Sequence, residues 1–180
     1  MNLDLLTSYF WLLNSDFWLL LMEYIWSPWR YRYIASSGKG EGCVFCRAQQ
    51  ADDRESLVVY RGRLNFVILN LFPYTSGHLM VVPYEHKADL AESDEATTTE
   101  MVELAKQAER ALEAEYHPDG FNIGMNLGRA AGAGVAEHLH LHVVPRWSGD
   151  ANFVSIVGET RVLPEDLRTT YDRLKKHFAE

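Results

Sequence analysis

The chain has 180 residues, 47% of them hydrophobic, and a formal net charge of −8 at pH 7. Its length and apolar content fit one domain with a core of its own. The acidic balance argues against a nucleic-acid-binding protein, which would carry a basic stripe, so we expect no nucleic acid among its partners.

The first 21 residues form an apolar segment that is interrupted by Asp4, Asn14 and Asp16. The two aspartates make the segment a poor membrane span, and no Lys or Arg precedes the apolar run as in a secretory signal. A membrane-surface or partner helix and a poorly packed appendage are two interpretations. We favour a third, in which residues 1–21 extend a protein that begins at Met22, so that residues 22–180 form the domain.

The two cysteines of the chain, Cys43 and Cys46, follow a loop with Gly and Ser at 35–42 and have Cys-x-x-Cys spacing. Spread pairs of cysteines are typical of secreted disulfide scaffolds, whereas this spacing suits a metal or redox role in a reducing compartment. We therefore expect a cytoplasmic protein.

Short β-type runs and two helical patterns occupy the rest of the chain. Strands are predicted at 56–61, 65–71, 78–83, 121–127 and 138–144. A long helix is predicted from the N-cap Ser93 to about His117, and a last helix from Pro164. Strands joined by tight turns, with helices between some of them, predict an α+β fold: an antiparallel sheet of about five strands with helices packed on one side.

The stretch EHLHLHVVPRW at 137–147 places three histidines at alternate positions. In a strand, His138, His140 and His142 share one face, and the leucines between them take the other. Pro145 has no N–H for a ladder, so the strand is expected to end near Val144. Three imidazoles on one face predict a metal site, a proton-transfer or nucleophilic site, or both side by side.

These motifs resemble those of a known family. HLHLHVV resembles the His-φ-His-φ-His-φ-φ signature of the histidine triad family of nucleotide hydrolases and transferases, in which φ is apolar. LNLFPYTSGHLMVVPYEH at 69–86 resembles the ribose-binding and Gly-His strands of that family, and CVFC at 43–46 resembles its bacterial zinc half-site. WSPWRYRYI at 26–34 and the segment 120–153 are similar, more narrowly, to the bacterial diadenosine tetraphosphate phosphorylases. The resemblance covers about residues 22–180.

Three histidines are candidates for the reaction. An imidazole nitrogen can attack phosphorus and hold a nucleotidyl group covalently, a role that the family gives to the position of His140. The other ring nitrogen must then be held by a backbone carbonyl or a similar acceptor. His142 is expected to donate to the phosphate or to the leaving oxygen. The resemblance makes His78 a further active-site histidine, for which a structural role is the alternative.

The resemblance also implies a metal centre. His86 and His138 would join Cys43 and Cys46 around a zinc ion, and four protein ligands make such a site closed and structural. The spacing alone supports only the cysteine pair. A redox motif and a surface role for His86 are the alternatives.

The remaining assignments concern the nucleotide, and they also follow from the resemblance. Asn70 would bind the ribose, Asn126 would contact phosphate, and backbone N–H groups of the Gly-rich loop 128–134 would approach an anion. Family members often have Ser, Thr or Gln just ahead of the histidine strand, where this chain has Gly134 and Val135, so a backbone contact is expected there. The implied base pocket consists of apolar residues that would also suit an ordinary core: Val44, Phe45, Ile68 and Leu71.

We therefore expect a nucleotidyl transferase that cleaves diadenosine polyphosphates by phosphorolysis, through an adenylyl-His140 intermediate, and releases ADP and ATP. Its partners would be adenine nucleotides and inorganic phosphate, and the resemblance implies a homodimer. A histidine triad hydrolase of dinucleoside polyphosphates or nucleoside phosphoramidates is one alternative. A zinc-stabilised nucleotide-binding module without turnover is the other.

Overall fold

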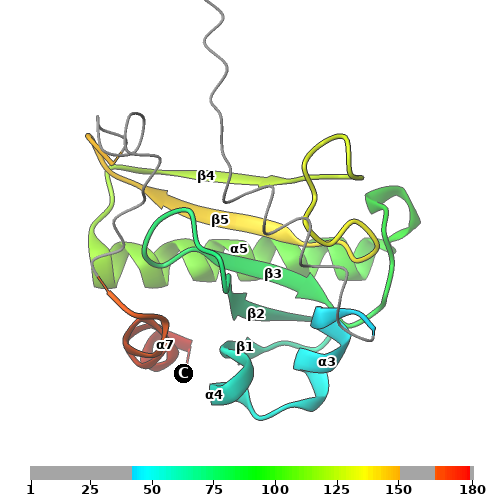
Figure 1. Cartoon of the computed structure of the whole chain (residues 1–180), viewed down its shortest axis with the longest axis horizontal. Coiled ribbons are helices and arrows are strands. Elements are labelled where there is room, and N and C mark those ends of the chain that lie inside the picture. The colour runs from blue at the N-terminus through cyan, green and yellow to red at the C-terminus, as the bar shows by residue number, and fades with distance from the viewer. Residues whose placement is uncertain (1–41, 151–164, 179–180) are drawn as a thin grey trace, which may run out of the picture.

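The computed structural model describes residues 42–150 and 165–178 (Figure 1). Helices α3 (Val44–Gln50) and α4 (Asp53–Ser56) precede strands β1 (Val58–Arg61), β2 (Asn65–Leu69) and β3 (Leu79–Pro83). The 3-10 helix η1 (Leu90–Glu92) and the long helix α5 (Glu95–Tyr116) follow, and then β4 (Gly120–Met125), β5 (Leu141–Arg146), α7 (Leu167–Lys175) and the 3-10 helix η2 (Lys176–Phe178). The expectations for residues 1–21 lie outside the described residues.

The strands form one five-stranded sheet in the order β1-β2-β3-β5-β4, and every neighbouring pair is antiparallel. This arrangement confirms the predicted α+β fold. After β3 the chain runs through α5 to β4, which lies at the edge of the sheet. Strand β5 then lies between β3 and β4. Its central position gives the histidine strand a partner on each side, with Val143 opposite both Leu79 and Ile123.

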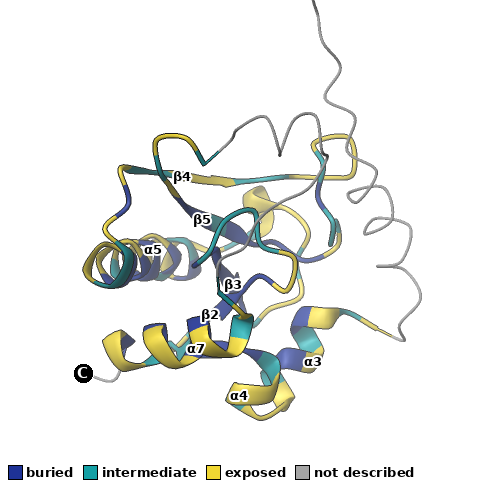
Figure 2. Cartoon of the chain, turned by 60° about the vertical axis from the view of Figure 1, so that its left-hand side comes forward, coloured by how far each residue is buried: buried dark blue, intermediate teal, exposed yellow. Residues whose placement is uncertain are grey.

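The main core lies between one face of the sheet and the helices α5 and α7. Val67, Leu141 and Val143 point toward α5, because alternate residues of a strand share a face. Helix α5 buries a stripe that includes Met101, Leu104, Ala108 and Leu112. Helix α7 turns its buried residues toward the sheet and its exposed residues outward (Figure 2). The two longest helices of the described residues thus cover the same face, as predicted.

A smaller core covers part of the opposite face. Phe66, Ile68 and Met80 point away from α5 and pack with Phe45 and Ala48 of α3. Helix α3 is an element that the sequence analysis did not predict. It spans only seven residues and has no side-chain cap at its first turn. Its packing on this face brings both cysteines to the side of the sheet that carries the histidines.

The histidine strand begins later than expected. Its pairing with the neighbouring strands starts at Leu141, so His138 and His140 precede β5 and only His142 lies within it. The backbone N–H of Leu139 donates to the Lys87 carbonyl at 2.6 Å, which ties this approach to the loop after β3. The alternation nevertheless holds, because Leu139 joins the α5 core while His138 and His140 face the other way.

Pro145 lies inside β5, although the strand was expected to end before it. The pairing of β5 with β3 stops at Val143, whereas β4 continues to pair as far as Arg146. The Pro145 carbonyl accepts a hydrogen bond from the Thr75 hydroxyl at 2.8 Å, on the β3 side. The backbone nitrogen of Pro145, which carries no hydrogen, therefore faces the β3 side. Because β3 no longer pairs with β5 there, no hydrogen-bond donor is required.

Several other boundaries also differ from the predictions, among them the following three. Strand β1 begins at Val58, because Leu57 has a left-handed backbone with a φ of 64° and ends α4. The N-cap of α5 is Asp94, whose carboxylate accepts the N–H of Thr97, and not Ser93. Helix α7 begins after the N-cap Asp166, and not at Pro164. Within the described residues, no helix is both long enough and apolar enough to cross a membrane.

Candidate active site and metal centre

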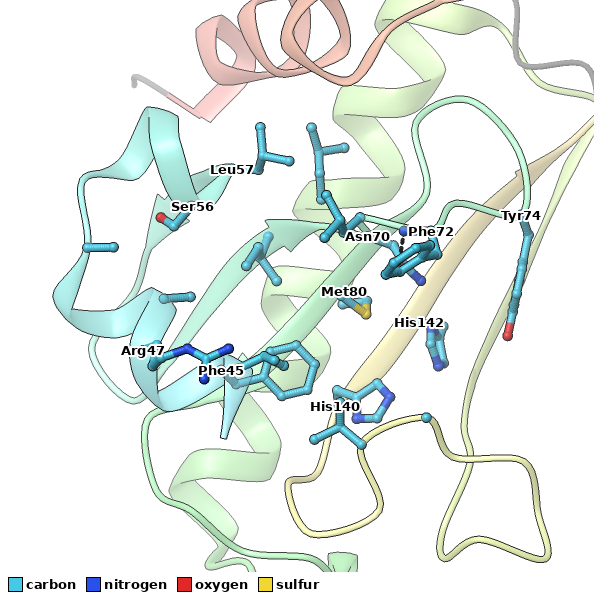
Figure 3. A pocket seen from close by; sticks show the side chains of 18 of the residues that line it. Phe45, Arg47, Ser56, Leu57, Asn70, Phe72, Tyr74, Met80, His140 and His142 are labelled. Carbon is cyan, nitrogen blue, oxygen red and sulfur yellow. Dashed lines mark hydrogen bonds between the residues drawn. The ribbon is translucent and has the colours of Figure 1, made fainter. Parts of the chain in front are cut away.

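A cavity of about 480 Å³ opens on the face of the sheet that carries α3 (Figure 3). Its apolar end includes Phe45 of α3, and its polar end includes His140 and His142. The cavity brings together nine of the residues that the sequence analysis assigned to catalysis or to nucleotide binding: Val44, Phe45, Ile68, Asn70, Leu71, Asn126, Gly134, His140 and His142. Apolar walls with a few convergent polar groups are typical of small-molecule sites.

His140 is held in one tautomer by the backbone. Its Nδ1 lies 2.8 Å from the carbonyl oxygen of His138, and since a carbonyl only accepts, Nδ1 carries the hydrogen. Nε2 is then left with the lone pair. Burial lowers the pKa of His140 although the hydrogen bond to the His138 carbonyl acts in the opposite direction, so the ring is neutral at neutral pH. The residue is only 5% exposed, and it lines the cavity.

A chain of hydrogen bonds determines which tautomer His78 and His142 adopt as neutral rings. The backbone N–H of Tyr74 donates to Nδ1 of His78 at 3.1 Å, so the hydrogen of the His78 ring is on Nε2. That Nε2 lies 2.9 Å from Nδ1 of His142 and donates to it. The ring hydrogen of His142 is consequently on Nε2. His78 itself is fully buried and does not line the cavity, so it acts on the cavity through His142.

Asn70 closes this network at the end of β2. Its Oδ1 accepts the backbone N–H of Phe72 at 2.9 Å, which turns the amide nitrogen toward His78 at 3.4 Å from Nδ1. Its own backbone N–H donates to the His78 carbonyl at 2.9 Å. Asn70 therefore lines the cavity and also ties the end of β2 to the start of β3.

The rings of His140 and His142 lie side by side, with centroids 4.8 Å apart and planes at 76°. With the tautomers above, the pair offers one lone pair on His140 and one N–H donor on His142. A nucleophile beside a proton donor is the combination that a two-step displacement at phosphorus requires.

Four predicted metal ligands come together beside this site. One ligand atom from each of Cys43, Cys46, His86 and His138 lies within 4.8 Å of all the others. His86 Nδ1 is 3.2 Å from His138 Nδ1 and 3.3 Å from Cys46 Sγ. His138 Nδ1 is 3.3 Å from Cys43 Sγ and 3.7 Å from Cys46 Sγ. A tetrahedron with ordinary zinc–nitrogen and zinc–sulfur bonds has edges of about 3.3 to 3.8 Å. These four distances are close to that range, and the remaining pairs, all within 4.8 Å, would need to close by at most about 1 Å around such an ion.

The chemistry of the donors also fits a cation. The Nε2 of His138 donates to the Pro83 carbonyl at 2.9 Å, which leaves the lone pair of Nδ1 facing the two sulfurs. Burial lowers the pKa of His138, and a neutral imidazole is the form that binds metal. Burial, followed by the neighbouring Cys43 side chain, raises the pKa of the Cys46 thiol. The effect of Cys43 is electrostatic repulsion between two negatively charged sulfurs, and a cation between them would offset it. The cluster can therefore hold a metal ion.

His138 and Phe45 connect the two centres. The ring of His138 belongs to the cysteine and histidine cluster, while its carbonyl holds the ring of His140. Phe45, which lies between the two cysteines in the sequence, contacts both histidine rings, with centroids 5.3 Å from His138 and 5.1 Å from His140. The position of α3 thus affects the metal cluster and the cavity together.

The Gly-rich loop folds back beside His140. Gly128 and Gly132 have φ values of 77° and 89°, which other residues adopt only under strain. The N–H of Gly132 donates to the Arg129 carbonyl at 3.0 Å, and the loop closes into a tight turn. Gly132 and Gly134 line the cavity together with Asn126. The predicted phosphate-facing residues are thus next to the histidine pair.

A family model of the HIT domain matches residues 51–149, which is more than half of the chain. The chain belongs to the HIT family. An AP-4-A phosphorylase of Mycobacterium tuberculosis is 41% identical over 166 residues, which cover 88% of this chain and 85% of that protein. A zinc-bound histidine triad family protein of Mycobacterium smegmatis has a solved structure that is 30% identical, with a TM-score of 0.62, and the match covers 80% of this chain and 96% of that one. The solved structure of a hypothetical histidine triad nucleotide-binding protein of Sulfolobus tokodaii is 28% identical, with a TM-score of 0.59. That match covers 76% of this chain and 89% of the other.

The HIT family model begins at Ala51, so α3 with Cys43 and Cys46 precedes the matched residues. Several further residues of this HIT protein line the cavity although they were not predicted from the sequence, among them Arg47, Phe72 and Tyr74. The two aromatic residues had a detectable signal, because they lie between Asn70 and His78, two residues that were themselves assigned to the site. Arg47 had none, since a short helix had not been predicted there.

Proposed function

We propose that this HIT protein is a phosphorylase of diadenosine tetraphosphate. The observation that carries the proposal is the tautomer of His140, whose Nδ1–H is bound to the His138 carbonyl at 2.8 Å inside a cavity large enough for a nucleotide. A binding module has no need for a buried imidazole with its lone pair directed at the ligand. The 41% identity to an AP-4-A phosphorylase supports this choice of substrate.

The proposed reaction has two displacements at the same phosphorus. In the first, Nε2 of His140 attacks the α-phosphorus, the bond to the bridging oxygen breaks, and ATP leaves with that oxygen and its electron pair. The Nε2–H of His142 donates to the departing oxygen. In the second, an oxygen of inorganic phosphate attacks the adenylyl group, the phosphorus–nitrogen bond breaks, and its electron pair returns to His140. Diadenosine tetraphosphate and phosphate thus give ATP and ADP.

The nucleotide would lie with its base among the apolar residues at the α3 end of the cavity and its ribose near Asn70. Asn126 and the backbone N–H of Gly134 would face the phosphates. In this proposal His78 orients His142 through the 2.9 Å hydrogen bond and does not touch the substrate.

We also propose that Cys43, Cys46, His86 and His138 hold a zinc ion. Four protein ligands leave no open position, so the ion would stabilise α3 and the loop after β3 without meeting the substrate. The distances within the cluster and the zinc-bound relative of Mycobacterium smegmatis support this assignment.

Product analysis with labelled inorganic phosphate tests the function. The phosphorylase should transfer the label into ADP, and omission of phosphate should sharply slow the consumption of diadenosine tetraphosphate. A hydrolase would use the same histidine but give unlabelled AMP as its main product at saturating phosphate. That result would overturn phosphorolysis and retain the covalent mechanism, whereas the absence of any turnover would overturn both.

A further inference from the structure

We propose that Tyr74 is a specificity residue that contacts the leaving nucleotide through its phenol hydroxyl. The inference rests on the proposed function and extends it, because it assigns the far wall of the cavity to the phosphates that depart with ATP.

The first reason for this assignment is the order of the side chains along the cavity. Figure 3 shows Phe45, His140, His142 and Tyr74 in succession, so Tyr74 lies beyond His142 as seen from the apolar end. The ring centroids of His140 and His142 are 4.8 Å apart, and those of His142 and Tyr74 are 6.1 Å apart with planes at 29°. Tyr74 therefore flanks the proton donor on the side away from the nucleophile and from the base.

The direction of the reaction carries the second step. A proton donor must lie within hydrogen-bond reach of the oxygen that departs, so the leaving group must lie on the His142 side of the α-phosphorus. The phosphates attached to that oxygen continue away from His140. Among the described residues that line the cavity, the next side chain in that direction is Tyr74, whose hydroxyl can donate a hydrogen bond to a phosphate oxygen while its ring stays apolar.

The backbone holds this tyrosine firmly, as a binding wall requires. Its N–H donates to His78 Nδ1 at 3.1 Å, and its ring lies 4.7 Å from the His78 ring. The next residue, Thr75, donates its hydroxyl to the Pro145 carbonyl at 2.8 Å. Gly77 has a φ of 79°, and a Cβ at this position would lie 2.7 Å from Leu112, so the end of the loop packs closely against α5. A rigid donor loses little entropy when the leaving group binds.

A comparison of two substrates tests the inference. Diadenosine tetraphosphate and adenosine 5′-phosphorimidazolide deliver the same adenylyl group, but the second expels imidazole and has no leaving phosphates. Tyr74→Phe removes only the hydroxyl and keeps the ring on His78 and His142. It should lower kcat/KM for the tetraphosphate by at least about tenfold, the factor for one hydrogen bond to a charged group, and leave kcat/KM for the imidazolide within about twofold. Tyr60→Phe is the matched control, because Tyr60 packs against Phe178 and does not line the cavity.

The possible outcomes separate this inference from the proposed function. A loss confined to the tetraphosphate supports the contact with the leaving group. An equal loss with both substrates, or no loss with either, overturns it. Wild-type protein that consumes the imidazolide but not the tetraphosphate would overturn the proposed substrate, and wild-type protein that consumes neither would overturn the covalent mechanism. In both of these cases the assignment of Tyr74 falls as well.

Discussion

Replacement of Glu100 by Gln should destabilise the fold, because one carboxylate of α5 closes the turn between β1 and β2. Oε2 accepts the backbone N–H of Leu64 at 2.6 Å and the backbone and side-chain N–H groups of Asn65 at 2.8 and 2.9 Å. Oε1 accepts the N–H of Arg63 at 2.9 Å. A glutamine can direct its single oxygen at the Asn65 side, but its NH₂ group then faces the Arg63 N–H donor.

The expected loss is about 2 to 4 kcal/mol in the free energy of unfolding, since one hydrogen bond is removed and three lose the charge of their acceptor. Burial of Glu100 opposes its ionisation, but the hydrogen bonds from Asn65, Leu64 and Arg63 outweigh burial, so the pKa lies below the ordinary 4.5. A depressed pKa contributes stability that is complete above 4.5 and is lost as the pH falls through the folded-state pKa. The difference between wild type and Glu100→Gln should therefore be constant at neutral pH and shrink in acid.

Urea unfolding followed by circular dichroism at pH 7 and at steps below about pH 5 measures both effects. Glu103→Gln is the control on the same helix, because Glu103 is exposed and pairs with the exposed Lys106, and it should change stability by less than about 0.5 kcal/mol. A loss at pH 7 no larger than that of the control would refute the argument. So would a difference that grows as the pH falls.

Four further predictions concern the site and the domain. His140→Ala should lower the turnover rate by several orders of magnitude and leave nucleotide binding measurable by calorimetry. Retained turnover would contradict the assigned nucleophile. Cys43→Ser should lower both the metal content, about one zinc per chain in the wild type, and the thermal midpoint; a wild-type preparation that is free of metal yet equally stable would contradict the zinc site. Gly77→Ala should destabilise by about 2 to 4 kcal/mol in urea unfolding, because it combines a φ of 79° with a Cβ 2.7 Å from Leu112; an unchanged midpoint would show that Leu112 moves aside. A chain that begins at Met22 should fold and turn over like the full chain, and aggregation of that variant would show that residues 1–21 belong to the fold.

Local sequence patterns predicted those parts of the structure that depend on local physics. The alternation of His138, Leu139 and His140 between two faces follows from strand geometry, and it holds although β5 begins only at Leu141. The long helix was predictable because an apolar stripe with helical spacing runs from Met101 to Leu112 within its 22 residues. Its exact first residue was not, since both Ser93 and Asp94 are good caps and only the contact with Thr97 distinguishes them.

The features that could not be predicted depend on contacts between residues that are far apart in the sequence. The tautomer of His142 depends on His78, which is 64 positions away, and on a backbone N–H of Tyr74. Helix α3 is too short to show a periodic pattern, and Phe45 and Ala48 are buried because Phe66 and Met80 lie under them. The resemblance identified the cysteines around Phe45, but it did not indicate that this ring also touches His140.

His138 takes part in both the metal-ligand cluster and the positioning of His140, which changes how an experiment with a chelator should be interpreted. Its ring nitrogen faces the cysteines while its carbonyl oxygen orients His140, so removal of the proposed metal ion would loosen the group that orients the proposed nucleophile. Activity should then decline in EDTA even if the ion, as proposed, does not contact the phosphates. The rate of that decline should follow the loosening of α3, seen as a change in aromatic circular dichroism, and added nucleotide should slow it. Inhibition by a chelator in this enzyme would accordingly report the integrity of the scaffold, and a metal-dependent rate would be no sign of metal-assisted chemistry.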